Sequence, residues 1–156
     1  RAVITADAWL VRHFQPQLSR LNWSGYKEEQ YPGLPLLRVL QARGELDSLQ
    51  AAWLAPTRPA VEFFDLKTDP QGLHNIAADP AQKPRLEALD GRLEAWIRDT
   101  HDTGAAGDPA TEPPLAEIQA EKRKTYQKVW QKRLQAPEPS DEERLAWWMR
   151  EYRLNP

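Results

Sequence analysis

The chain has 156 residues, enough for one domain with a modest core and some additional elements. Its formal net charge of -2 gives it no overall attraction to nucleic acid or to an anionic membrane surface, so neither is expected as a partner. It has no cysteine, which excludes disulfides, thiolate nucleophiles and zinc fingers, and no apolar run approaches the roughly 20 residues that span a bilayer.

The first predicted element is a hairpin. Residues 2–5 and 9–14 are rich in β-branched and aromatic side chains, with turn residues between them. Because Arg1 leads directly into this strand pattern, we expect the chain to be a piece of a longer polypeptide, with any targeting segment upstream. Residues 15–35 are polar and broken by Pro and Gly, which predicts a loop.

The middle of the chain predicts two short helices, a strand and a long amphipathic helix. Apolar residues at helical spacing mark the short helices: Leu36, Leu37 and Leu40, then Leu46, Leu49 and Trp53. Residues 59–66 alternate as a strand, and Asp79 followed by Pro80 marks a helix start. The long helix that follows carries one apolar stripe: Leu86, Leu89, Leu93, Trp96 and Ile97.

The C-terminal part changes in character. Residues 104–114 are assigned to a linker by composition, which separates an α+β unit at 1–103 from a two-helix extension at 115–156. Packing residues of the first of these helices are Leu115, Ile118, Tyr126, Val129, Trp130 and Leu134. Ser140 and Glu143 have capping-box spacing before the second. The predicted fold class is α+β, a small antiparallel sheet packed on an amphipathic helix and followed by a helical extension.

Polar residues cluster after the predicted strand at Asp65, Asp69, His74, Asn75 and Asp79. One interpretation is a metal or acid–base site. The other is a structural corner, in which Asp69 and Asn75 bond local amides in turns and Asp79 caps the next helix. No ligand spacing typical of a metal site is present, so the sequence favours the structural corner.

Three further sets of residues have both a functional and a structural interpretation. Arg12 and His13 are adjacent on a strand end and point to opposite faces, which favours a sheet-edge pair over a shared pocket. His101 follows a helix end, where the helix dipole favours a histidine. A basic run between 122 and 133 could suit a polyanion, but a solvated helix face is favoured because acidic residues follow at 138–143.

The two halves of the α+β unit resemble the C-terminal subdomain of formylglycine-dependent sulfatases. The family pattern R-x-V-R-T-x-x-Y-K-Y-I-R-N-F is matched here at Arg1, Val3, Thr5, Arg12 and Phe14. The pattern E-L-Y-D-L-x-x-D-P-x-E-x-x-N-L-A is matched, conservatively at two positions, at Glu62, Phe64, Asp65, Leu66, Asp69, Pro70, Asn75, Ile76 and Ala77. The resemblance covers residues 1–103, and the middle insertion and the ending around Trp96 are similar to the heparan N-sulfatase (sulfamidase) branch. The chain departs from the patterns at Ile4, Ala8, Trp9 and Gly72.

The resemblance implies hydrolysis of a sulfuric ester or sulfamate by the full-length protein. The family uses a formylglycine, made in the motif C/S-x-P-x-R, and a calcium ion; neither this motif nor a recognisable calcium motif occurs in this chain. The resemblance therefore implies that nucleophile and metal site lie upstream, in an N-terminal catalytic domain that is the partner of this chain, and it favours a periplasmic or secreted location. In this interpretation no residue of this chain is catalytic or metal-binding, and Arg12 and His13 contact the sulfated substrate at the rim of its binding pocket.

A different class of function stays open. The chain could be a non-catalytic interaction module that binds a partner through the terminal helical hairpin. A C/S-x-P-x-R motif before Arg1 would support the hydrolase, and a native start near Arg1 would support the module.

Overall fold

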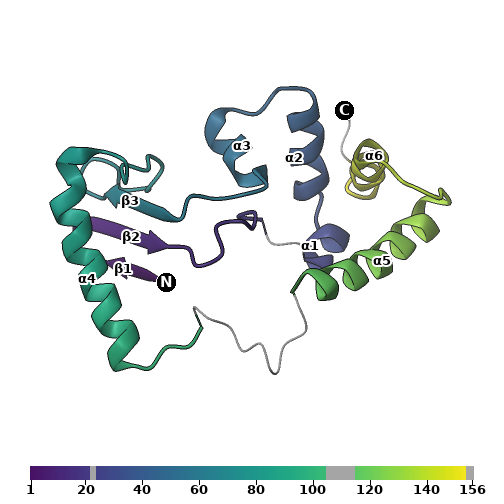
Figure 1. The fold of residues 1–156 in the computed structure, drawn as a ribbon. Coiled ribbons are helices and arrows are strands. Elements are labelled where there is room, and N and C mark those ends of the chain that lie inside the picture. Colours follow the sequence, from purple (N-terminus) through teal and green to yellow (C-terminus); the bar gives the residue numbers. More distant parts are fainter. Residues whose placement is uncertain (22–23, 105–114, 154–156) are drawn as a thin grey trace. The chain divides into compact units, whose positions relative to one another are not determined.

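The computed structural model describes residues 1–21, 24–104 and 115–153, with side chains from 120 onward in the last range, and the chain forms two compact units (Figure 1). Unit 1 comprises residues 1–19 and 56–110, and unit 2 comprises residues 20–55 and 111–156. The segment 20–55 thus groups with the C-terminal helices, whereas the sequence analysis placed it in one unit with the rest of 1–103. The predicted linker begins at Gly104, and its other residues, 105–114, lie outside the described residues.

Unit 1 contains a three-stranded antiparallel sheet in the order β1-β2-β3, formed by Ala2–Ile4, Ala8–Arg12 and Val61–Asp65. Its register pairs Val3 with Leu10 and Leu10 with Phe63. Thr5 closes the hairpin by donating its backbone N–H to the Ala8 carbonyl at 2.9 Å. The predicted hairpin and the predicted third strand are therefore confirmed.

One face of this sheet is covered by α4 (Lys83–Asp99), which follows the short 3-10 helix η1 (Pro80–Gln82) (Figure 1). Strand residues alternate between faces, so Leu10 and Phe63 point together toward the helix, and both are fully buried. Leu89 of the predicted helical stripe packs with them in one core cluster, and Leu93 of the same stripe is also buried. The predicted amphipathic helix is confirmed, although Trp96 at its end is 51% exposed.

The opposite face of the sheet carries Trp9 and Phe64, whose rings lie 5.3 Å apart between centroids. The corner after β3 comes back over these rings, with Gly72 at φ +62° directly against Trp9. Ile4, in register with Trp9 on the same face, is 68% exposed. This face is therefore covered only in part by unit 1.

Unit 2 is helical. Its elements are α1 (Gly25–Gln30), α2 (Gly33–Ala42), α3 (Ser48–Leu54), α5 (Leu115–Leu134) and α6 (Asp141–Glu151). Its core includes Tyr126, Trp130 and Trp148, whose rings meet edge to face. The predicted helices at α2, α3, α5 and α6 are confirmed, and Ser140 and Glu143 form the predicted capping box. The predicted packing residues Leu115 and Ile118 lie outside the described side chains.

The loop predicted for residues 15–35 is wrong in part, because it contains the helix α1 and the start of α2. The sequence of α1 has no apolar stripe and its N-cap makes no side-chain hydrogen bond. Its one buried side chain is a carboxylate, Glu28, which is held by groups from α2 and α5. Tertiary contacts, rather than local helix signals, therefore stabilise this short helix.

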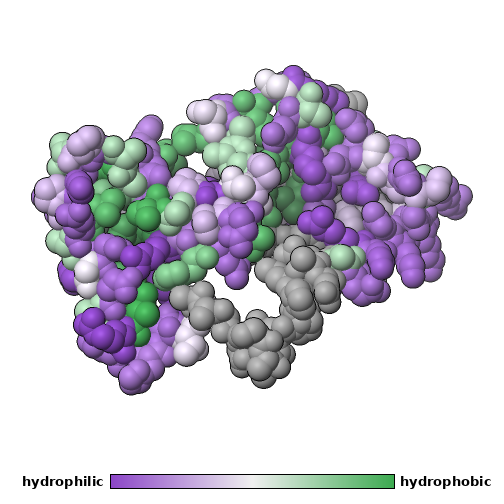
Figure 2. Space-filling view, viewed as in Figure 1, coloured by the Kyte–Doolittle hydropathy of each residue, from purple (hydrophilic) through white to green (hydrophobic). Residues whose placement is uncertain are grey.

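The architecture confirms the predicted α+β fold class. On the face seen in Figure 2, hydrophobic residues gather around the strands of unit 1, whereas the visible surface of α5 is mainly hydrophilic. Among the helices described, none has both the length and the apolar character required to cross a bilayer.

Two glycines test the packing of the corner against the sheet. Alanine at Gly72 would combine a left-handed φ with a Cβ 2.9 Å from the Trp9 ring, so we expect the free energy of unfolding to fall by about 2 kcal/mol. Gly91 lies inside α4 with open space where a Cβ would be added. Gly91→Ala should therefore raise the free energy of unfolding by up to about 1 kcal/mol. Denaturant unfolding of both variants measures the two signs, and equal effects would contradict the close packing of the corner.

Candidate functional site

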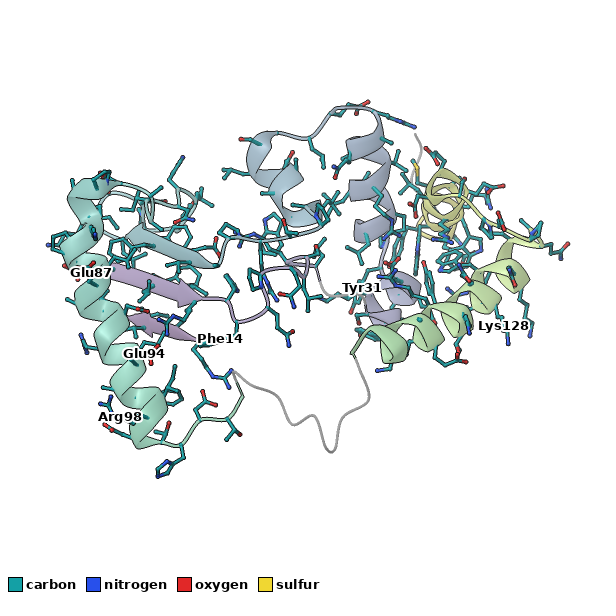
Figure 3. The ribbon with its side chains drawn as sticks, viewed as in Figure 1. Phe14, Tyr31, Glu87, Glu94, Arg98 and Lys128 are labelled. Carbon is teal, nitrogen blue, oxygen red and sulfur yellow. The ribbon has the colours of Figure 1, made fainter. Side chains whose placement is uncertain are left out.

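Arg12 lies at the end of β2 on the face that α4 covers. Its guanidinium donates to Asp90 at 2.8 Å and to Glu94, both on α4, and lies over the Phe14 ring at 5.8 Å (Figure 3 labels Phe14 and Glu94). These bonds use two of the five N–H donors of the guanidinium, and the side chain is 23% exposed. Arg12 is therefore oriented by unit 1 itself and still partly accessible.

His13 points to the opposite face, as the strand alternation predicts. Its Nε2 lies 2.6 Å from the Glu62 carboxylate, and Glu62 is only 4% exposed. A carboxylate buried to this degree needs hydrogen-bond partners, and the His13 ring is one of them. Arg12 and His13 thus do not converge on one cavity, and each is engaged with acids of its own unit.

The corner after β3 uses its polar side chains on the backbone. Asp69 Oδ2 accepts from the backbone N–H groups of Leu73 and His74, both at 2.8 Å. Asp79 accepts from the Ala81 N–H at 2.9 Å and so caps η1. His74 is mostly exposed and lies 3.6 Å from the Asp69 carboxylate. Every carboxylate–amide bond here is local, as expected for a turn.

Asn75 does more than a local turn requires. Its Oδ1 accepts from the Phe63 N–H at 2.9 Å and from the Ala77 N–H at 3.0 Å, while its Nδ2 donates to the Val61 carbonyl at 3.2 Å. The side-chain amide thereby pairs with the outer edge of β3 as a further strand would. Asn75 ties the corner to the sheet and satisfies a strand edge.

A second arginine links sheet and helix at the other end of β2. Arg85 on α4 donates to Asp65 at 3.1 Å and lies 3.3 Å from the Asp7 carboxylate, with its guanidinium over the Phe63 ring. The Lys67 N–H is the largest cause, and Arg85 a further one, of an Asp65 pKa below its ordinary value. Sequence reasoning missed this arrangement, because no motif relates positions 7, 65 and 85.

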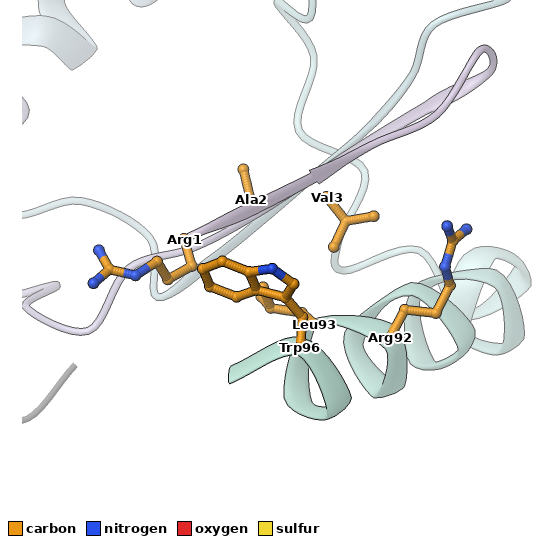
Figure 4. Close-up of a pocket in the computed structure, with 6 residues that line it drawn as sticks. All are labelled: Arg1, Ala2, Val3, Arg92, Leu93 and Trp96. Carbon is orange, nitrogen blue, oxygen red and sulfur yellow. The ribbon is translucent and has the colours of Figure 1, made fainter. Parts of the chain in front are cut away.

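A shallow pocket of about 290 Å³ lies between β1 and α4 (Figure 4). Val3 and Leu93 give it an apolar floor, and the Trp96 indole lies against the start of β1. The side chains of Arg1 and Arg92 extend to opposite sides of it. Arg1 is held by Asp102, and this hydrogen bond is the main cause that lowers the pKa of Asp102 to about 2.

Unit 2 contains a partly buried charge network centred on Glu28. Both oxygens of Glu28 accept from Arg38, at 2.8 and 2.7 Å, and Arg38 also donates to Asp141 at 2.8 Å. Burial disfavours the charged guanidinium, but its bonds to these two carboxylates outweigh burial and raise the pKa of Arg38. The Tyr126 hydroxyl donates to Glu28 at 3.0 Å. Since the carboxylates are already paired, this network is suited to joining helices rather than to proton transfer.

The described residues assemble no cluster that could hold a metal ion. Within residues 1–21, 24–104 and 120–153, no three side chains of His, Asp or Glu come together in a way that could hold a metal ion. His74 and His101 are both exposed. His101 adopts φ 51° immediately after α4, where it ends the helix. The described residues therefore do not fit the calcium site that the resemblance implies for the full-length protein.

Comparison with curated proteins gives one informative similarity. An ulvan-active sulfatase of Formosa agariphila is 31% identical to this chain over 113 residues, which are 72% of the chain and 18% of the relative. The matched segment thus covers only 18% of the length of that protein. No family model matches, and no solved structure matches. The similarity supports a sulfatase-family relationship; the heparan N-sulfatase branch stays a prediction.

The role of Asn75 can be tested directly. Asn75→Ala leaves the N–H of the buried Phe63 without its acceptor, so we expect the free energy of unfolding to fall by about 1–3 kcal/mol. Asn75→Asp keeps the acceptor for the Phe63 and Ala77 N–H groups and replaces only the donor to the Val61 carbonyl by a carboxylate oxygen, so its loss should be smaller. His74→Ala, at an exposed neighbour, should change stability by less than about 0.5 kcal/mol.

Denaturant unfolding of the three variants gives the order of these effects, and the parent protein gives the functional readout. In the parent, the Asn75 variants should leave turnover of the folded fraction largely intact. A large fall in turnover at unchanged stability would move this corner into the active site.

Proposed function

We propose that this chain is the C-terminal portion of a sulfatase-like hydrolase, which hydrolyses a sulfuric ester or a sulfamate in the full-length protein. The observation that carries the proposal is the 113-residue similarity to an ulvan-active sulfatase. The positions of the sulfatase-like patterns support it further, because Asp69 and Asn75 build the corner that joins the sheet to α4. A sulfated glycan is then the substrate class that this relative suggests.

In this proposal the chain does not itself perform the reaction. The sequence lacks cysteine and any Ser-x-Pro-x-Arg segment, so it offers no precursor for a formylglycine. The formylglycine and the calcium ion would be supplied by an N-terminal catalytic domain of the same polypeptide. Polarising a sulfate ester requires a preorganised cationic site of that kind.

The supporting role of the chain is assigned to the sheet face opposite α4. Ile4 is 68% exposed there. A covering surface would remove the Ile4 side chain from water and so stabilise this face. Because the relative extends far beyond the matched segment, we propose that the preceding catalytic domain covers this face.

The decisive experiment compares the chain with its parent. The coding sequence upstream of Arg1 should contain a C/S-x-P-x-R motif, and the parent should hydrolyse an aryl sulfate in a calcium-dependent way, whereas the purified 156-residue chain should not. Replacing the motif's Cys or Ser by Ala in the parent should abolish turnover. Turnover by the chain alone, or an upstream sequence without the motif, would contradict the proposal; the second result would favour the interaction module built on α5 and α6.

A finer part of the proposal places Arg12 and His13 at the substrate rim. Arg12 has unused donors that suit a sulfate group, and its carboxylate partners hold it in a fixed orientation. In the parent protein, Arg12→Ala and His13→Ala should raise KM several-fold with little change in kcat, because binding is lost equally in ground and transition states.

Arg85→Ala is the matched control for Arg12→Ala. Arg85 also joins α4 to two carboxylates and is 30% exposed, but it lies at the other end of β2. Both variants should lose similar stability, and only Arg12→Ala should raise KM. If KM is unchanged in Arg12→Ala and His13→Ala while stability falls, both residues are purely structural.

A further inference from the structure

The pocket between β1 and α4 combines features that none of the roles above uses. Trp96 is 51% exposed, although Leu89 and Leu93 of the same helix are buried. Its indole presents an apolar surface beside an apolar floor. An exposed aromatic ring next to an apolar floor is a surface on which a flat, partly apolar ligand can stack.

Arg92 adds a charge that the protein does not compensate. Among the described residues it makes no hydrogen bond and no ion pair, and it is exposed. Its helical neighbours three and four positions away are Ala88, Leu89, Ala95 and Trp96, so its own helix offers no carboxylate. The nearest acids of α4 in sequence, Asp90 and Glu94, are bound to Arg12. Arg92 is thus available for an anion from solution.

Arg1 provides a second guanidinium on the other side of the indole. Asp102 accepts from its Nη2 at 2.7 Å and holds the side chain beside the pocket, so part of its charge is neutralised. The Arg1 side chain is still 39% exposed. One oriented and one uncompensated arginine, on opposite sides of a tryptophan, present donors to anionic groups at the edges of a ring that stacks on the indole (Figure 4).

We propose that this pocket is a binding subsite for one sulfated sugar ring of an oligosaccharide. The ring would stack through its C–H face on Trp96, and a sulfate group would be bound by Arg92, with Arg1 at the other side. A volume of about 290 Å³ suits a single ring rather than a larger ligand. This inference rests on the proposed function for the sulfated character of the ligand and names a contact outside Arg12 and His13.

The test is calorimetric titration of the 156-residue chain with a κ-carrageenan tetrasaccharide, its desulfated form and sodium sulfate. The chain should bind the sulfated tetrasaccharide, and the desulfated form and sodium sulfate should each bind at least about tenfold more weakly, since both the charged and the stacking contact are required. If the desulfated tetrasaccharide bound as tightly as the sulfated one, the pocket would not recognise sulfate, and the proposal would be overturned. If sodium sulfate bound as tightly, the pocket would be an anion site that does not recognise the sugar, and the proposal would likewise be overturned.

Variants at matched positions locate the site. Arg92→Gln and Trp96→Ala should each weaken binding by about tenfold. Arg98→Gln removes the same charge from α4 outside the pocket (Figure 3 labels Arg98), and Trp53→Ala removes a tryptophan that is 54% exposed in unit 2. Both controls should bind as the unchanged chain does. Circular dichroism shows whether Trp96→Ala remains folded, and Arg92→Gln, at an exposed position, tests the site independently.

Binding and hydrolysis are separate readouts. If the parent lacks sulfatase activity but the chain binds the sulfated tetrasaccharide through Arg92 and Trp96, the proposed function fails and the subsite stands. If the parent is an active sulfatase and Arg92→Gln leaves both tetrasaccharide binding by the chain and the parent's KM for a sulfated oligosaccharide unchanged, the subsite fails and the proposed function stands.

Discussion

Unit 1 depends on the burial of one sheet face against α4. Strand residues repeat every two positions and helix residues every 3.6, so a flat apolar face and an apolar stripe can meet only if both patterns are kept. Leu10 and Phe63 from the sheet and Leu89 from the helix satisfy this condition, because they are buried together in one core cluster. Around this core, Arg12 joins the end of β2 to acids of α4, and Arg85 joins α4 to an acid at the end of β3. These two links fix where α4 crosses the sheet. Hydrophobic burial thus supplies most of the stabilisation, and the charged pairs at the margins set the position of the helix.

Because α4 occupies one face, the polar corner and the partly exposed residues fall on the other. Trp9 and Phe64 are covered by the backbone around Gly72, which must approach closely and therefore has no side chain. Asn75 then closes the edge of β3. The cluster of Asp, His and Asn that resembles a metal site in the sequence is accounted for by these backbone demands. The same demands give a structural reason for the Asp69 and Asn75 positions of the sulfatase-like pattern.

The sequence predicted most elements of the fold because their signals are local. The alternation in β2 and β3, the stripe on α4 and the box at Ser140 and Glu143 each arise within a few residues. The helix α1 was not predicted because the residues that stabilise it lie on other helices: Glu28 is bound by Arg38 and Tyr126. The pairing of Arg12 with α4, and the edge pocket with Arg1 and Trp96, likewise depend on strand register and helix position, which no local pattern specifies.

Unit 2 is built from two segments that look unrelated in the sequence. Residues 20–55 resemble an insertion in the α+β unit, and residues 111–156 resemble an added tail, yet they form one set of helices. Glu28 comes from the first segment, Tyr126 and Asp141 come from the second, and Arg38 binds both carboxylates. The buried Glu28–Arg38 pair lies within the first segment, and the second segment adds the Tyr126 hydroxyl to Glu28 and the Asp141 carboxylate to Arg38. The insertion and the tail therefore stabilise each other and are best regarded as a single structural addition to the sulfatase-like unit.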